Sequence, residues 1–340
     1  MARSKIRPEK DVWDNSFVEQ YYNRDHDIVP HEDPKDDPKY DEKNKLIRRV
    51  QDIVGTHGSG KPPLNIAIVG TPGGGKSSLL NTIFASFSTE RWTEIVPFGS
   101  FGRAHRQRTT RFTSYVKDTY YKRREPDDYL MPTFLDMTGF EDDESEKCVA
   151  LLELVCTGRI KENEELKQAK DYAANNGPGA LLERYNRGVC HRPVDRIIVV
   201  CTSNPLVNLP ENFLNAVWEA STKHRAIPVY GVLTCRDKYP PDVVRDRIES
   251  FRNLLALPKC RFAHIINYCD DIDTEGLHFD TTIPSLDVPV LQLMKQVLNP
   301  RQDDPPLPTP TPPPPLDILA IVAFIFAVMA FIYVLLISNR

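Results

Sequence analysis

The part of the chain whose residues could do chemistry is a glycine-rich turn between an apolar run and an amphipathic segment. The apolar run is Leu64–Val69, and the turn that follows, from Gly70 to Ser78, fits the pattern G-x-x-x-x-G-K-[ST]. Glycine backbone can curl so that several N–H groups face one anion, and a following helix points its positive end at the same place. The pattern predicts a phosphate-binding loop, with an ordinary glycine-rich turn as the alternative.

The residue types in this loop suit a phosphate chain and its metal ion. Lys76 would reach the β- and γ-phosphates, and the hydroxyl of Ser77, beside them, would hold Mg²⁺. The other predicted phosphate-binding residues are Gly70, Gly73, Gly74, Gly75 and Ser78.

A second motif, D-x-x-G, ends the next apolar run and consists of Asp136 and Gly139. In a nucleotide switch the Asp holds Mg²⁺ through its second shell, and the Gly N–H contacts the γ-phosphate. Between the two motifs, Thr109 and Thr110 each offer a hydroxyl that could bind Mg²⁺ when the γ-phosphate is present, and the sequence does not choose between them. These residues predict a site that senses the γ-phosphate.

A third motif, T-x-x-D, follows a later apolar run and consists of Thr234 and Asp237. A carboxylate here can accept both N1–H and N2–H of guanine, a pair that adenine does not offer. Cys235 stands where the common lysine of such motifs would pack on the base. The alternative is an Asp that caps the next helix. We expect a guanine contact at Asp237.

Strand-like and helix-like segments alternate from Leu64 onward, which predicts an α/β fold with a mostly parallel central sheet flanked by helices. Nucleotides bind at the carboxyl ends of such strands, where the glycine-rich turn lies. Two of the segments, 111–118 and 130–136, are expected to form a two-stranded edge. The other expected strands are 64–69, 195–201, 227–233 and 261–267.

In this order the three motifs resemble the P-loop GTPases of the translation-factor-related class. Together with Ile266-Asn267-Tyr268, they resemble the interferon-induced protein forty-four family, which carries Asn-Tyr after its last strand. The resemblance covers about 62–298. It implies a P-loop NTPase G domain that binds GTP or GDP with Mg²⁺, and it implies that Asn267 contributes to the guanine site.

No catalytic residue is assigned. Phe140 follows D-x-x-G, where small GTPases place the glutamine that orients water. Pro72 adds bulk where an arginine finger would enter. We therefore expect slow GTP hydrolysis, or hydrolysis in a homodimer that supplies an arginine from residues 103–111. The alternatives are a nucleotide-binding structural protein without turnover and, third, a P-loop ATPase or kinase.

Composition limits the classes of partner. The 340-residue chain has a net charge of −4, which gives no support for nucleic-acid binding. Its seven cysteines are scattered without framework spacing, which favours a reduced compartment. The charged N-terminus lacks the apolar stretch of a cleavable signal peptide.

Changes in composition divide the chain into four parts. Residues 1–42 are predicted to be a disordered polar tail, and residues 43–299 the G domain. A helical insertion at about 158–192 is expected beside the D-x-x-G loop. Residues 300–317 are a proline-rich linker, and 318–337 are predicted to be a single transmembrane helix.

The predicted span Ile318–Ile337 has twenty uncharged residues, enough for a helix of about 30 Å, the thickness of the hydrocarbon core. Only Ser338, Asn339 and Arg340 follow it. We expect a tail anchor with the N-terminus in the cytosol. The long apolar run and sparse basic flank favour the endoplasmic reticulum over the mitochondrial outer membrane.

Overall fold

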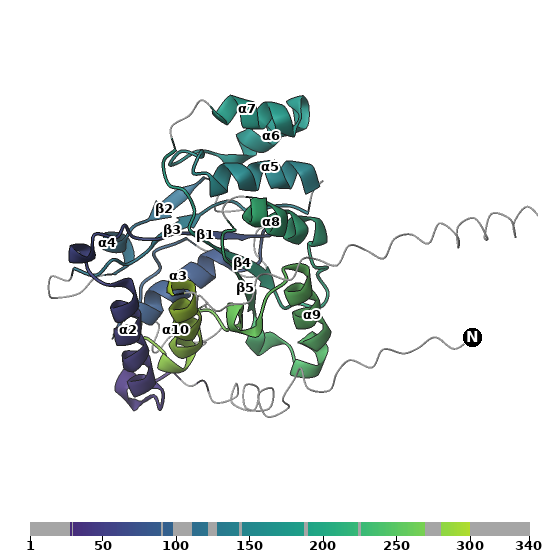
Figure 1. Cartoon of the computed structure of the whole chain (residues 1–340). Coiled ribbons are helices and arrows are strands. Elements are labelled where there is room, and N and C mark those ends of the chain that lie inside the picture. Colours follow the sequence, from purple (N-terminus) through teal and green to yellow (C-terminus); the bar gives the residue numbers. More distant parts are fainter. Residues whose placement is uncertain are drawn as a thin grey trace, which may run out of the picture. The chain divides into compact units, whose positions relative to one another are not determined.

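The computed structural model, drawn in Figure 1, describes residues 28, 30–89, 91–97, 111–121, 128–142, 145–186, 190–223, 226–268 and 280–299. Thr109 and Thr110, the predicted linker 300–317 and the predicted membrane span 318–337 lie outside these residues. Among the helices that are described, none is both long and apolar enough to cross a membrane.

Six strands form one sheet in the order β2-β3-β1-β4-β5-β6. All neighbours are parallel except β2, which is antiparallel to β3 at the edge. The strands are β1 Asn65–Gly70, β2 Thr113–Tyr115, β3 Thr133–Asp136, β4 Arg196–Thr202, β5 Val229–Thr234 and β6 Phe262–His264. The predicted α/β fold with a mostly parallel sheet and a two-stranded edge is confirmed.

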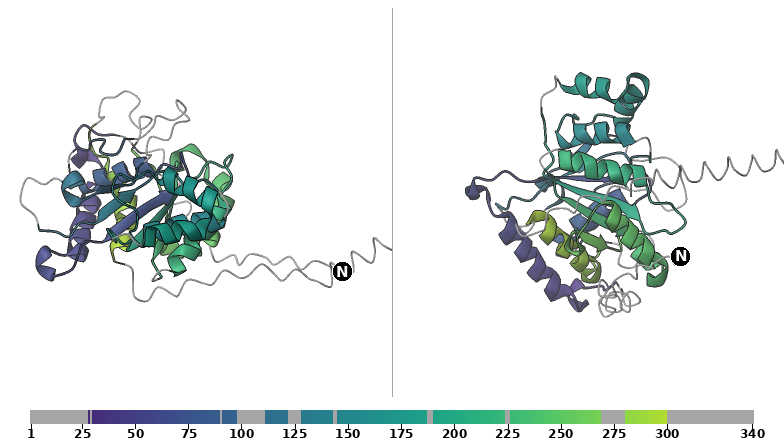
Figure 2. Two further views of the ribbon diagram at one scale, coloured as in Figure 1. Left: turned by 90° about the horizontal axis from the view of Figure 1, so that it is seen from above. Right: turned by 45° about the vertical axis from the view of Figure 1, so that its right-hand side comes forward.

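Helices cover both faces of the sheet because successive strand residues point to opposite sides. In β1, Ile66 and Ile68 are buried against α2, α3 and α10, whereas Ala67 and Val69 are buried in the cluster that α5, α8 and α9 form. Figures 1 and 2 show these two layers. The helices are α2 Tyr40–Val54, α3 Lys76–Phe87, α4 Lys117–Tyr120, α5 Ser145–Cys156, α8 Glu211–Lys223, α9 Pro241–Leu254 and α10 Pro284–Leu298.

The predicted insertion contains two helices, α6 (Leu166–Asn176) and α7 (Pro178–Asn186), and they lie over α5 in Figure 1. Gly177 lies between the two helices, and its φ of 85° is a positive value that glycine adopts more readily than other residues. Short 3₁₀ turns complete the described fold: η2 Pro34–Asp36, η3 His57–Ser59, η4 Arg236–Lys238 and η5 Lys259–Arg261.

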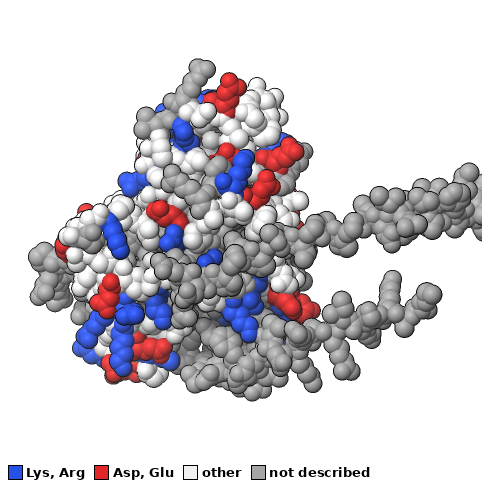
Figure 3. Space-filling model, in the orientation of Figure 1, with Lys and Arg blue, Asp and Glu red and all other residues white. Residues whose placement is uncertain are grey.

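Charged side chains of both signs are interspersed on the face shown in Figure 3, with a dense mixed group over α2. The described residues on this face form no broad area of positive charge, in keeping with the slight net charge.

The folded region begins before residue 43, so the predicted disordered tail 1–42 is too long at its end. Helix α2 starts at Tyr40, and the carboxylate of Asp37 accepts hydrogen bonds from both the N–H and the hydroxyl of Ser285, over 3.0 and 2.9 Å. The reason is tertiary: these polar residues bind the first turn of α10, a partner far along the chain.

A buried ion pair joins α2 to α10. Lys43 Nζ lies 2.7 Å from Asp287 Oδ2, and both side chains are 0% exposed. The other oxygen of Asp287 accepts a hydrogen bond from Tyr268 Oη over 3.0 Å. Removing one charge of a buried pair leaves the other uncompensated, which costs more than removing both.

We predict that Lys43→Met and Asp287→Asn, made singly, each lower the free energy of unfolding by about 3–5 kcal/mol. The double variant should lose less than the sum, because it removes both charges and Asn still accepts from Tyr268. Chemical denaturation of the four proteins measures this. Glu42→Gln, in the exposed pair with Lys39, is the control and should cost less than about 1 kcal/mol. Additive losses would contradict the prediction.

Candidate functional site

The glycine-rich turn joins the end of β1 to the start of α3 at the carboxyl edge of the sheet. Gly73 and Gly75 have φ of 71° and 90°, a conformation that residues with a Cβ rarely adopt. Leu79 N donates to Gly75 O over 2.8 Å, so the helix is hydrogen-bonded from its first turn. The turn therefore has the strand–loop–helix context that a phosphate-binding loop requires.

Two glycines allow this loop to pack against neighbouring strand ends. A Cβ on Gly70 would lie 2.1 Å from Val200 O of β4, and a Cβ on Gly139 would lie 2.4 Å from Pro72 N. Phe140 N also donates to Gly70 O over 3.0 Å. The structure thus brings the D-x-x-G motif into direct contact with the phosphate-binding loop.

Lys76 is folded back on the loop. Its Nζ donates to Thr71 O over 2.9 Å, and the residue is 8% exposed. Burial lowers the pKa of Lys76 to about 8, while the charge of Asp136 opposes that shift. The buried carboxylate of Asp136, at the end of β3, and the Lys76 ammonium therefore interact across the loop.

The residues present fit a Mg²⁺ ion. Mg²⁺ prefers oxygen ligands, keeps several waters and is often bound by one or two side chains plus phosphates. Ser77, in the first turn of α3, supplies a hydroxyl, and Asp136 supplies a 1%-exposed carboxylate. Within the described residues no three His, Cys, Asp or Glu side chains cluster as an all-protein metal site would need. Bound Mg²⁺ would neutralise phosphate charge at this place.

Thr234 and Asn267, which are predicted to bind guanine, contact the phosphate-binding loop and its helix. Thr234 is 1% exposed, and its hydroxyl donates to Gly74 O over 3.0 Å. Asn267 Oδ1 lies 3.2 Å from Thr82 Oγ1 on α3, and a Cβ on Gly75 would lie 3.3 Å from Asn267 Nδ2. Their polar atoms hold the loop in place, because a buried polar group needs a partner.

Asp237 alone among the predicted guanine-binding residues faces outward. It lies in η4 just beyond β5, its side chain is 29% exposed, and its carboxylate is 3.5 Å from Lys238 Nζ. Cys235, where a lysine was expected, has a left-handed φ of 63°, and its carbonyl accepts from Ser203 Oγ over 3.1 Å. The turn that presents Asp237 is therefore tied to the end of β4.

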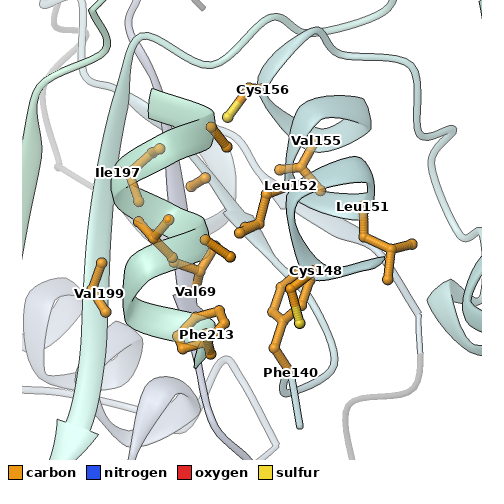
Figure 4. Close-up of a cluster of buried hydrophobic side chains, with 14 of the residues drawn as sticks. Val69, Phe140, Cys148, Leu151, Leu152, Val155, Cys156, Ile197, Val199 and Phe213 are labelled. Atoms are coloured by element: carbon orange, nitrogen blue, oxygen red, sulfur yellow. The ribbon is translucent and has the colours of Figure 1, made fainter. Parts of the chain in front are cut away.

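Phe140 points into the core and away from the phosphate-binding loop. It is 1% exposed, and its ring stacks on Phe213 of α8 with centroids 5.3 Å apart. Figure 4 shows both rings at the foot of the cluster, beside Cys148. Asp142 Oδ1 accepts from Phe213 N over 2.9 Å, so the acidic run after D-x-x-G caps α8. Phe140 thus anchors the loop and cannot orient a water.

One residue that contacts the D-x-x-G loop, Lys170 of α6, was not predicted from the sequence. Its Nζ donates to Gly139 O over 3.3 Å and lies 5.7 Å from the centroid of the Phe140 ring. A lysine in a charged, polar segment carries no pattern that distinguishes it from a solvated one. Only the packing of the insertion on α5 brings it to the D-x-x-G loop.

His264 at the end of β6 makes folding sensitive to acid. Burial, assisted by the charge of Arg236, lowers its pKa to about 3, from an ordinary value near 6.5. Below pH 6.5 the unfolded chain therefore binds a proton that the folded chain does not, and stability falls as the pH drops toward 3.

We predict that lowering the pH from 6.5 to 5 costs the wild type about 2 kcal/mol more free energy of unfolding than it costs His264→Gln. Denaturant unfolding at several pH values measures this slope. The exposed His191→Gln is the matched control and should follow the wild type. Equal slopes in His264→Gln and wild type would refute the prediction.

Comparison with known proteins gives structural neighbours only. No family model matches the chain, and no curated protein matches it. Toc33 from Arabidopsis thaliana, in complex with Mg²⁺ and GMPPNP, is 14% identical and aligns over 77% of this chain and 94% of its own, with a TM-score of 0.38. A GTP-binding protein from Sulfolobus solfataricus, in complex with GDP, is 14% identical over 76% of this chain and 67% of its own, with a TM-score of 0.30.

Proposed function

We propose that the chain binds GTP and GDP with Mg²⁺ at the loop from Gly70 to Ser78. The contact of Gly139 with Pro72 carries this proposal, because it joins the two motifs that would surround the γ-phosphate. Lys76 would bind the phosphates, and Ser77 and Asp136 would hold Mg²⁺.

The base contact is assigned to Asp237. Its carboxylate is accessible at the carboxyl edge of the sheet, beyond the strand whose Thr234 holds the loop. Guanine offers it two N–H groups, and adenine would leave the charge unpaired.

We further propose that the protein is a nucleotide-dependent switch with slow hydrolysis. Thr109 or Thr110 and the Asp136–Phe140 segment would be ordered by the γ-phosphate. The burial of Phe140 supports slow turnover, since no side chain at that position can orient water. A second candidate is a structural protein that binds a nucleotide without hydrolysing it. The burial of Phe140 supports this candidate as much as it supports the slow switch.

We also propose, from composition alone, that the chain is located at a membrane. The apolar residues 318–337 would anchor the chain in a membrane, with the G domain in the cytosol and 300–317 as a semi-rigid spacer. We place the anchor in the endoplasmic reticulum in preference to the mitochondrial outer membrane.

We predict that the full-length chain in detergent binds GTP and GDP at least about tenfold more tightly than ATP. Lys76→Ala should abolish binding of all three, because the phosphates lose their cation. Asp237→Ala should retain binding but lose the preference for guanine. Titration with fluorescent nucleotides and competition by unlabelled ones measures both effects.

The exposed Lys61→Ala and Asp246→Ala are matched controls and should bind like the wild type. Full binding by Lys76→Ala would remove the phosphate assignment. An unchanged base preference in Asp237→Ala would remove the guanine assignment, and an ATP preference in the wild type would favour a P-loop ATPase.

We predict that hydrolysis of bound GTP is slow in dilute protein and accelerates as concentration rises, if a second copy supplies an arginine from residues 103–111. Single-turnover assays over a range of protein concentrations test this. Fast hydrolysis at the lowest concentration would refute the slow switch. Absence of turnover at every concentration would favour the structural candidate.

A further inference from the structure

The helical insertion contacts the rest of the chain at two places, Phe112 and Gly139. The first attachment lies directly after the segment that contains Thr109 and Thr110. There Phe112 N donates to Glu164 O and Asn163 N donates to Phe112 O, each over 2.8 Å. These paired backbone bonds join the start of the insertion to Phe112, just before β2.

The second attachment is Lys170, on α6, and it reaches the other loop. Lys170 Nζ donates to Gly139 O, and Gly139 itself packs on Pro72 of the phosphate-binding loop. The insertion therefore contacts the D-x-x-G loop at the glycine whose N–H is expected to meet the γ-phosphate.

The charge of Lys170 is poorly compensated where it stands. Within the described residues, its ammonium contacts a carbonyl oxygen and an aromatic ring, which are both neutral. An anion bound beside Gly139 would give this ammonium a partner of opposite charge.

We propose that the Lys170 ammonium binds the γ-phosphate of the bound nucleotide, and that this contact changes how the insertion, α6 and α7, is held against the D-x-x-G loop. The inference rests on the proposed function and names the regulation of that site. With a triphosphate bound, the ammonium gains a charged partner beside Gly139. With a diphosphate bound, it keeps its neutral contacts, and the insertion is held differently. The insertion would therefore differ between the triphosphate-bound and diphosphate-bound protein.

The test is the ratio of affinities for a non-hydrolysable GTP analogue and for GDP, measured with the full-length chain. Lys170→Met should weaken binding of the analogue by about tenfold and leave GDP binding within about twofold, since a charge-assisted hydrogen bond to phosphate is lost. Lys170→Arg should keep most of the wild-type ratio. Lys167→Met, exposed on the same helix, is the matched control and should not change it.

Hydrogen exchange of residues 166–186 gives a second readout. In the wild type the analogue and GDP should protect these residues differently, and Lys170→Met should abolish the difference. A Lys170→Met protein that loses affinity for both nucleotides equally, or for neither, would overturn the inference and leave Lys170 as a structural contact. If Lys170→Met does not fold, Lys170→Gln is measured in the same way.

These outcomes are distinct from failure of the proposed function. A wild-type chain that binds neither nucleotide would refute the proposed function itself. A wild-type chain that binds both, with an unchanged ratio in Lys170→Met and Lys170→Gln, would refute the role of Lys170 alone.

Discussion

The site depends on a steric constraint: at two glycines, the backbone around the phosphate-binding loop is packed so closely that a Cβ has no room. Gly70 lies against Val200 O of β4, and Gly139 lies against Pro72. Thr234, at the end of β5, adds a hydrogen bond to Gly74 O. Three strand ends therefore hold a loop whose own residues have left-handed conformations that cost backbone entropy.

A buried polar network connects α3, the helix that follows the loop, to α10 and α2 at the two ends of the folded region. Tyr268 N donates to Thr82 Oγ1 of α3, and Tyr268 Oη donates to Asp287, the partner of Lys43. The residues Asn267 and Tyr268 thus join α3 to α10 and α2. Because each member of the network is buried, its polar atoms are worth most when all partners are present. This explains why α2, which precedes the first motif, belongs to the folded core.

The site and the insertion together suggest how one nucleotide site could serve a switch. The D-x-x-G loop is anchored in the core by Phe140 and contacted by Lys170 from outside. Gly139 packs against Pro72 and Phe140 N donates to Gly70 O, so this loop joins the phosphate-binding loop, the core and α6. In the switch that we propose, a change in the contact between Lys170 and this loop would reach α6 and α7.

The amino-acid sequence alone predicts the alternation of strands and helices and the strand–turn–helix that contains Lys76, because hydrophobic period and glycine spacing are local properties of the chain. It does not predict the contacts of Thr234 with Gly74 and of Asn267 with Thr82, since a side chain at a strand end can point at a ligand or at a neighbouring loop. It gave no sign of Lys170 or of the Lys43–Asp287 pair, whose partners lie 31 and 244 residues away. These contacts depend on the fold, because the packing of helices on the sheet, and not spacing along the chain, brings such residues together.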